Sequence, residues 1–172
     1  MDYIFPYLSP LGGLTLASDG EALTGLWFDG QAHFGSTLGP AYEERALPVF
    51  AETARWLDLY FGGTAPDFTP PLRLIGTDFR RLIWTLLREI PYGRTTSYAA
   101  LAQRAAARLG RERMSARAVG GAVGCNPISL IVPCHRVLGA GGRLTGYAGG
   151  LERKARLLSL EGADPAALCF PE

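Results

Sequence analysis

The chain has 172 residues, 48% of which are apolar, and its formal net charge is +1. This length is sufficient to bury the core of one domain or of two small ones. No apolar run approaches the roughly 20 residues of a membrane span, and the N-terminus lacks the basic region and the cleavage pattern of a signal peptide, so we expect neither.

The first part of the chain is predicted to form a small sheet followed by one helix. Residues 3–8, 13–18 and 23–28 are rich in strand-forming side chains and are separated by turn residues, which predicts three short antiparallel strands. A glycine-containing loop follows. Residues 46–61 carry apolar side chains at helical spacing and end before Gly62, so we expect a helix there.

A change of charge marks a domain boundary. Residues 64–76 contain three prolines and are predicted to be extended. Residues 1–70 contain nine acidic and two basic residues, net −7, whereas residues 71–172 contain seven acidic and fifteen basic residues, net +8. We therefore predict an N-terminal domain, 1–76, and a C-terminal domain, 77–172. The arginine-rich second part suits a polyanion, although arginine could also simply stand in place of lysine.

The C-terminal domain is predicted to be mostly helical. Thr77 precedes a helix over residues 79–90, and residues 98–109 form a second helix that ends at Gly110. Three hydroxyl residues are candidate caps for the second helix: Thr95, Thr96 and Ser97. A short helix over residues 115–124 follows a charged loop. Two helices joined by a polar turn in a basic domain are typical of a helix-turn-helix, but such pairs also occur in domains that do not bind DNA.

The short helix has few side chains on its surface. Gly120 and Gly121 each cost about 1 kcal/mol relative to alanine in a helix, and they leave a bare face that another backbone can approach closely. Arg117 projects from this helix. Tight packing against the core also explains the two glycines, and both explanations can hold.

Cys134 is the main candidate for a reactive residue. An apolar run, Ile128 to Val132, ends at the tetrapeptide PCHR. A thiol reacts as its thiolate, which requires a nearby positive group, donor or base, and His135 is adjacent. Pro133 favours a turn that lets the two side chains meet, directly or through water. Glu161 is the candidate carboxylate behind the imidazole. The alternative is that Cys134 is a small buried apolar residue.

The three cysteines indicate neither a disulfide framework nor a metal site. Cys125, Cys134 and Cys169 are odd in number and form no C-x-x-C, and only His33 and His135 could add soft ligands. We expect no metal, no cofactor and a reducing compartment, namely the cytoplasm of a bacterial or archaeal cell.

Several motifs occur in a fixed order along the C-terminal domain. They are IPYGRTTSYAALA (90–102), RAVG (117–120), Asn126-Pro127, PCHRV (133–137), GYAGG (146–150) and LEG (160–162). In this order they closely resemble the O6-alkylguanine-DNA alkyltransferase family, the methylated-DNA–protein-cysteine methyltransferases. The match is strong over residues 77–162 and covers the N-terminal domain in architecture only.

The resemblance implies an α+β fold. The expected N-terminal domain is a small three-stranded antiparallel sheet plus a helix, ribonuclease-H-like. It is followed by a mostly helical C-terminal domain with a helix-turn-helix, winged-helix-like.

The resemblance also implies single-turnover DNA repair. Members of the family transfer an alkyl group from the O6 atom of guanine to their own cysteine, which restores the base and consumes the protein. The implied partner is double-stranded DNA with the lesion flipped out, bound through its minor groove by a monomer, and O4-alkylthymine is a further candidate substrate. Cys134 is the implied acceptor, His135 relays its proton through water, and Glu161 orients His135.

Further roles are implied residue by residue. Asn126 is expected to brace the turn that carries Cys134, and Tyr98 to donate toward the guanine ring or to rotate the phosphate during extrusion. The backbone carbonyls of Cys134 and Val137 are expected to accept from the exocyclic amine. The implied pocket residues are Val137, Tyr147, Ala148, Ser129 and Thr145. The implied DNA-binding residues are Arg117, which fills the gap left by the flipped base, with Ala116, Gly120, Gly121, Thr95, Thr96, Ser97 and Arg136.

Three other functions fit parts of the sequence. A lesion-binding protein without chemistry fits the domain but not Cys134. A cysteine hydrolase fits the Cys–His pair but not Arg117 or the basic domain. A helix-turn-helix regulator leaves the PCHR motif unexplained.

Overall fold

The structure, a computed structural model, describes residues 1–163, and its contacts divide the chain into two units. Unit 1 contains Met1–Ile75 together with the later segment Pro127–Ile131. Unit 2 contains Gly76–Asn126 and the described residues from Val132 onward. The single predicted boundary, between residues 76 and 77, therefore does not describe residues 127–131, which lie in unit 1 although they come later in the sequence.

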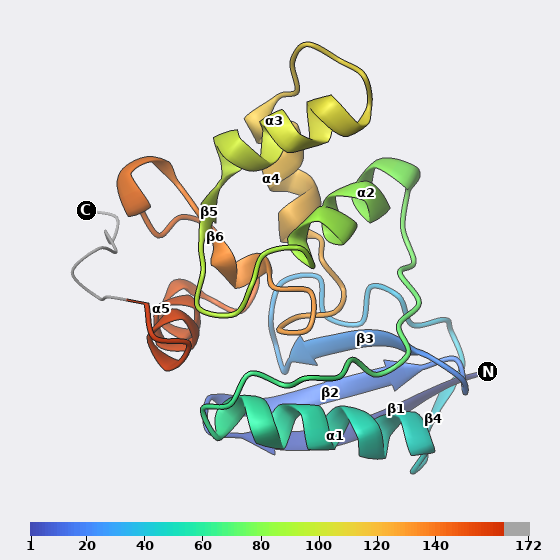
Figure 1. Cartoon of the computed structure of the whole chain (residues 1–172). Helices are drawn as coiled ribbons and strands as arrows, with labels where there is room; N and C mark the ends of the chain where they lie inside the picture. The colour runs from blue at the N-terminus through green and yellow to red at the C-terminus, as the bar shows by residue number, and fades with distance from the viewer. Residues whose placement is uncertain (164–172) are drawn as a thin grey trace. The chain divides into compact units, whose positions relative to one another are not determined.

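Unit 1 is built on a four-stranded sheet (Figure 1). Its strands are β1 (Asp2–Ser9), β2 (Gly12–Ser18), β3 (Leu23–Phe28) and β4 (Tyr42–Glu44), in the order β3-β2-β1-β4. The first three are antiparallel neighbours, as predicted, but β4 pairs parallel with β1. The predicted three-stranded antiparallel sheet is therefore incomplete, and the sheet is mixed. The short β4 is exposed and acidic, so it shows no apolar alternation that a sequence pattern could detect.

Helix α1 (Pro48–Phe61) runs along one face of this sheet (Figure 1). It begins two residues later than predicted, because proline at the first helical position fixes a helical φ and needs no hydrogen bond there. Its apolar stripe is buried, and Phe50 stacks on Phe5 of β1 with ring centroids 5.9 Å apart. The sheet and α1 thus share one core.

Two short segments cover the outer edge of β3. The Leu23 N–H donates to Pro71 O (2.7 Å) and the Leu26 N–H donates to Pro127 O (2.8 Å). Each strand residue also accepts a bond from the same segment: the Arg73 N–H donates to Leu23 O and the Ser129 N–H donates to Leu26 O, each at 2.9 Å. An exposed sheet edge is prone to unwanted pairing, so these bridges protect it. They also explain why residues 127–131 belong to unit 1.

Unit 2 is mostly helical. Its helices are α2 (Asp78–Leu87), α3 (Tyr98–Arg108), α4 (Ala116–Gly124) and α5 (Leu151–Leu160), and it also contains the parallel strands β5 (Thr96–Ser97) and β6 (Val137–Leu138) and the 3₁₀ turns η1 (Cys134–Arg136) and η2 (Ala140–Gly142). The side chains of Thr77, Ser97 and Ser115 cap α2, α3 and α4 by accepting from backbone N–H groups. Helix α2 ends three residues before its predicted end at Ile90, since a residue that precedes proline disfavours helical geometry.

Trp84 fastens α2 to α4, the second helix of the predicted helix-turn-helix. Its ring is buried, and its Nε1 donates to the carbonyl of Ala122 at 2.8 Å. The close fit extends to Gly76, where an added Cβ would lie 2.5 Å from the Trp84 ring. The buried indole therefore holds α4 against α2.

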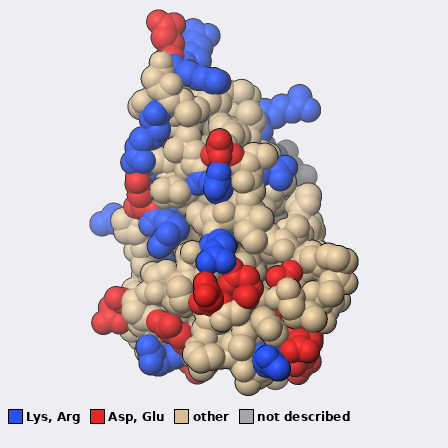
Figure 2. All heavy atoms as spheres, turned by 90° about the vertical axis from the view of Figure 1, so that its right-hand side faces the viewer, with Lys and Arg blue, Asp and Glu red and all other residues tan. Residues whose placement is uncertain are grey.

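The surface carries acidic and basic side chains next to each other (Figure 2). Glu89 pairs with both Arg104 and Arg108. In contrast, Arg117 has no ion pair among residues 1–163. Within the same residues, no helix is long and apolar enough to cross a membrane.

Gly25 in β3 provides a test of the unit 1 core. A Cβ at this position would lie 2.0 Å from the Trp27 ring, so Gly25→Ala is expected to lower the free energy of unfolding by about 1–3 kcal/mol. Gly121→Ala is the control, because nothing lies within 4 Å of its Cβ position, and it should match or exceed wild type by up to about 1 kcal/mol. Urea unfolding measures both, and an unchanged stability for Gly25→Ala contradicts the described packing of Trp27.

Candidate active site

The turn that carries Cys134 is the centre of the site. Pro133 precedes the 3₁₀ turn η1, and the N–H of Arg136 donates to Pro133 O at 3.0 Å. The N–H of Val137 donates to Cys134 O, after which the chain enters β6. The change of direction expected at Pro133 is therefore present. Because neighbouring residues in a turn do not point to opposite faces as in a strand, Cys134 and His135 can serve one site.

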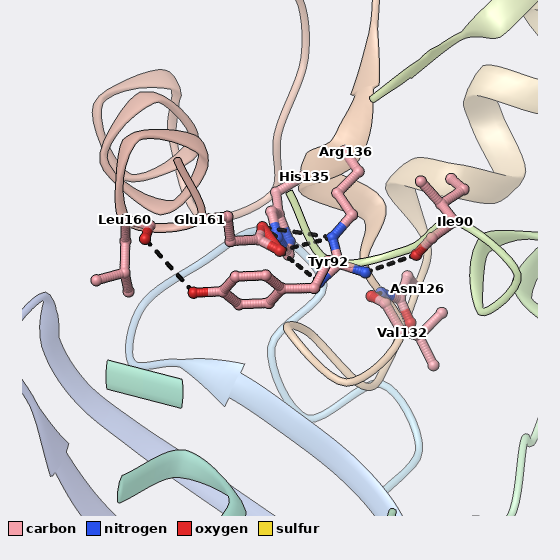
Figure 3. Close-up of polar contacts among 8 residues, drawn as sticks. All are labelled: Ile90, Tyr92, Asn126, Val132, His135, Arg136, Leu160 and Glu161. Carbon is pink, nitrogen blue, oxygen red and sulfur yellow. Dashed lines mark hydrogen bonds and ion pairs between the residues drawn. The ribbon is translucent and has the colours of Figure 1, made fainter. Parts of the chain in front are cut away.

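Asn126 holds the residues that precede Cys134 (Figure 3). Its Nδ2 donates to Val132 O at 2.8 Å. The N–H of Cys134 donates to the same oxygen at 2.8 Å. The Asn126 side chain is itself buried. It thus lies where the sequence expects the brace of this turn.

His135, Arg136 and Glu161 form a buried network (Figure 3). The Nε2 atom of His135 lies 2.6 Å from Glu161 Oε2, and the Nε atom of Arg136 donates to Glu161 Oε1 at 2.7 Å. Arg136 Nη2 also donates to Glu161, while Nη1 donates to Ile90 O at 2.7 Å. The side chains of His135 and Glu161 are 0% and 1% exposed. One carboxylate at the C-cap of α5 therefore fixes both the imidazole and the guanidinium.

Burial and hydrogen bonding set the ionisation of these groups. Burial raises the pKa of the Cys134 thiol, opposed by a hydrogen bond from Asn126 and the charge of Lys154. Burial lowers the pKa of His135, although Glu161 opposes this. Burial alone would raise the pKa of Glu161, but bonding to His135 and Arg136 outweighs it and keeps that pKa below its usual value. The resting site therefore holds a neutral thiol, a neutral imidazole and an ionised carboxylate.

A small cavity opens onto the thiol. Its volume is about 100 Å³, and it is lined by Tyr98, Gly120, Val123, Gly124, Cys134, Gly146, Tyr147 and Ala148. The Tyr98 hydroxyl donates to Thr145 O at 3.1 Å. Burial raises the pKa of Tyr98 to about 12, so its hydroxyl stays a neutral donor near pH 7. In residues 1–163, no group of three or more His, Cys, Asp or Glu side chains could hold a metal ion.

Two predicted positions are not supported by the structure. Arg136 was expected to contact DNA, but it is 8% exposed and its guanidinium donors are directed to Glu161 and Ile90, so it is a structural ion-pair residue. Ser129 was expected at the pocket rim, but it is buried in unit 1, where its backbone pairs with Leu26. A motif gives the order of residues and not the partners that tertiary contacts supply.

The other predicted pocket positions lie around the cavity in different ways. Tyr147 and Ala148 line it. Val137 is buried immediately after η1. Thr145 contributes its carbonyl to Tyr98, whereas its hydroxyl lies near Gly139, 3.2 Å from where a Cβ on that glycine would stand.

The predicted DNA-binding residues are grouped on α4 and before α3. Arg117, Ala116 and Gly121 are exposed on α4, and Gly120 lies between that surface and Tyr98. Thr95 is also exposed, and Thr96 is half-buried in β5. Ser97 is used as the N-cap of α3, where its Oγ accepts from Ala100 N at 3.0 Å.

Lys154 is a site residue that the sequence reasoning missed. It is 0% exposed, and its Nζ donates to Val137 O at 2.6 Å and to two carbonyls of the 145–146 segment. The missed signal is its helical spacing, since Leu151, Lys154, Leu158 and Glu161 fall on one face of α5. A lysine on an apolar stripe indicates a buried, partnered charge.

The combined geometry defines a class of protein. A buried thiol faces a cavity beside an imidazole–carboxylate pair, and α4, which lines that cavity, presents a bare surface with an arginine that has no ion pair among residues 1–163. This is a cysteine-dependent transferase built into a DNA-binding domain.

Comparison with known proteins identifies the family. Residues 4–74 match "6-O-methylguanine DNA methyltransferase, ribonuclease-like domain", and residues 78–163 match "6-O-methylguanine DNA methyltransferase, DNA binding domain". The chain belongs to the methylated-DNA–protein-cysteine methyltransferase family. Its function is the repair of O6-methylguanine in DNA by methyl transfer to the protein's own cysteine. The predicted family, enzyme class and α+β fold are confirmed.

Individual relatives agree over nearly the whole chain. The methylated-DNA–protein-cysteine methyltransferase of Mycobacterium leprae is 46% identical over 153 residues, which cover 89% of this chain and 88% of the relative. That of Haemophilus influenzae is 43% identical over 160 residues, covering 92% and 86%. A crystal structure of Mycobacterium tuberculosis OGT in complex with DNA has a TM-score of 0.81 and 41% identity, covering 97% and 95%.

Two arginine variants separate a structural role from a DNA contact. Arg136→Met removes the partner of a buried carboxylate and should cost about 3–5 kcal/mol of unfolding free energy, with no change in the salt dependence of DNA binding. Arg117→Met should leave stability within about 0.5 kcal/mol of wild type and lower the salt slope by about 0.9. Urea unfolding and titration of a duplex at several salt concentrations measure both effects. The assignment of Arg136 fails if its variant is fully stable but has a reduced salt slope.

Acidification is expected to destabilise the folded protein in two steps. The pKa of His135 lies below its ordinary value of 6.5 in the folded state, so the unfolded chain binds the proton first, and stability is lost as the pH falls through that interval. The lowered pKa of Glu161 acts in the same direction, and its contribution to stability is lost as the pH falls below 4.5. Urea unfolding from about pH 8 to about pH 4 measures this.

His135→Asn should flatten the step that begins near 6.5. An unchanged profile for His135→Asn is incompatible with a buried neutral imidazole.

Proposed function

We propose that Cys134 is the alkyl acceptor and that the reaction is a single-turnover transfer from O6-alkylguanine to its Sγ atom. The observation that carries this proposal is the position of Cys134, which lines the cavity next to an imidazole held by a buried carboxylate. Cys125, the other described cysteine, is half-buried at the C-cap of α4 and does not line that cavity.

His135 acts as the base that takes the thiol proton. Burial raises the pKa of Cys134, so the thiol needs a proton acceptor, and burial lowers the pKa of His135, so the imidazole is neutral and able to accept. Glu161 binds Nε2, which orients the ring so that Nδ1 receives the proton through water. The carboxylate, itself anchored by Arg136, stabilises the imidazolium that results.

The transfer balances without a cofactor. The Sγ–carbon bond forms as the carbon–O6 bond breaks, and the electron pair of that bond stays with the purine. The purine then takes one proton, which equals the proton that the thiol lost, so guanine and a neutral thioether remain. Tyr98 is a neutral donor at the cavity wall, and its single O–H turns from Thr145 O to the purine ring as negative charge develops on that ring.

Two backbone carbonyls select guanine within the pocket. Those of Cys134 and Val137 accept hydrogen bonds from the exocyclic amine, which O6-alkylated guanine retains. Each carbonyl also accepts a bond inside the protein, from Val137 N–H and from Lys154 respectively, but a carbonyl oxygen has two lone pairs. Both acceptors are therefore fixed in direction before substrate arrives.

The partner is double-stranded DNA that carries the lesion, bound by one protein molecule. Cys134 is 5% exposed, so a base within the stack cannot reach it, and the nucleotide has to be flipped out. The bare face of α4 suits a close approach to the narrow minor groove, and Arg117 fills the gap left in the stack. Contacts to phosphate without base readout allow repair at any sequence. The Mycobacterium tuberculosis relative crystallised in complex with DNA supports DNA as the partner.

Intact-protein mass spectrometry tests the assignment of the acceptor. Incubation with a duplex that contains one O6-methylguanine should add one methyl group per protein molecule, once only and on Cys134. Cys134→Ser should gain none, and Cys125→Ser, the matched control, should react as wild type does. Methylation of Cys125, or more than one lesion repaired per protein molecule, contradicts the proposal. Repeated release of free product is the result expected of a hydrolase.

A further inference from the structure

Lys154 is a fully buried ammonium group without a carboxylate partner. In the part of the chain that the structure describes, no acidic side chain forms an ion pair with it, and its Nζ donates to Val137 O (2.6 Å), Gly146 O (3.1 Å) and Thr145 O (3.2 Å). A buried charge is costly unless it is well hydrogen-bonded, and three carbonyls meet the three donors of an ammonium group. The arrangement is complete without an anion.

The three carbonyls belong to two segments that adjoin or line the cavity at Cys134. Val137 directly follows the turn that carries the thiol, and its own N–H bonds to Cys134 O. Gly146 lines the cavity and is followed by Tyr147 and Ala148, which also line it. Lys154 is therefore a cross-link between the residue after the thiol turn and the 145–146 backbone, which leads into the lining segment.

Lys154 and Glu161 act from the same helix face. Seven residues separate them, which is about two helical turns, so both point toward η1 and the segment after it. Glu161 holds the imidazole side of the turn, and Lys154 holds its pocket side. A buried charge is not needed for stability alone, since replacement of buried charged groups by apolar side chains of similar volume commonly gives equal or greater stability. What an apolar side chain cannot do is set the direction of three carbonyls.

We propose that Lys154 is a positioning residue for base selection, whose ammonium group holds the Val137 carbonyl and the 145–146 backbone at the spacing that accepts a purine with an exocyclic amine. The inference rests on the proposed function, in which Val137 O accepts from that amine. It goes beyond that function by naming the side chain that aims the acceptor.

The surroundings of Lys154 indicate when this cross-link is lost. Burial lowers its pKa to about 8, opposed by the charge of Cys134 when the thiol is ionised. The other titratable groups that face it are His135, whose own pKa the lysine lowers, and Tyr98, whose ring lies 5.8 Å from Nζ. A neutral amine has only two donors, so the third carbonyl is released as the pH rises past this range.

The experiment compares two matched duplexes, one with O6-methylguanine and one with O6-methylhypoxanthine, which lacks the exocyclic amine. Single-turnover methylation of Cys134 is followed for wild type, Lys154→Met, Lys154→Arg and Arg156→Met. Arg156 is the matched control, because it is exposed on the same helix and loses the same charge. The measured quantity is the ratio of the two rate constants, in which titration of Cys134 and His135 cancels.

Wild type and Arg156→Met should prefer guanine by about tenfold or more, the effect of about one hydrogen bond. Lys154→Met should bring the ratio close to one, chiefly by slowing the guanine substrate, and Lys154→Arg should restore part of the preference. An equal slowing of both substrates with the ratio kept overturns the proposal, because it shows a merely structural role.

If Lys154→Met does not fold, the proposal is tested by measuring the ratio of the two rate constants for wild type over a series of pH values. The ratio should fall as the pH rises through about 8, and a constant ratio from about pH 7 to about pH 9.5 overturns the proposal. Failure of the proposed function is distinguishable, because wild type would then methylate Cys134 with neither duplex.

Discussion

The carboxylate of Glu161 is the group on which the rest of the site depends. It is buried, so its charge is tolerable only because an imidazole and a guanidinium bind it together. Arg136 also donates to the carbonyl of Ile90, so it connects Glu161, the C-cap of α5, to the segment after α2. Loss of Arg136 would leave the carboxylate without a cationic partner, bound only by a neutral imidazole, and would free the geometry around His135. A proton relay needs such a fixed ring, since a rotated imidazole cannot receive the thiol proton.

Helix α5 supplies both charges that organise the pocket, although it lines no part of the cavity. Glu161 and Lys154 act on opposite sides of the turn at Cys134, one through a side-chain network and the other through backbone carbonyls. The thiol between them is neutral at rest because burial raises its pKa. In the proposed mechanism it ionises only when a substrate and the imidazole are in place. A single-turnover protein tolerates this, because it has no need to regenerate its acceptor.

Arginine serves two opposed purposes in unit 2. Arg136 is buried and neutralised, whereas Arg117 is exposed on a helix whose glycines leave room for another molecule. Between these extremes, Arg104 and Arg108 share Glu89 at the surface. The positive charge of this part of the sequence is therefore not uniformly available to a polyanion. Which arginines can reach phosphate depends on the carboxylates that the fold places beside them.

Local signals in the sequence determined most of the elements and the identity of the reactive cluster. Helical periodicity, the hydroxyl caps of α2 and α3 and the PCHRV motif are short-range features, so they could be read directly. The placement of Glu161 behind His135 also followed from the order of motifs. Only the tertiary structure decided the parallel strand β4, the return of Pro127–Ile131 to unit 1, the burial of Arg136 and the carbonyl partners of Lys154. Each of these depends on contacts between residues far apart in the chain, and a local pattern carries no information about such partners.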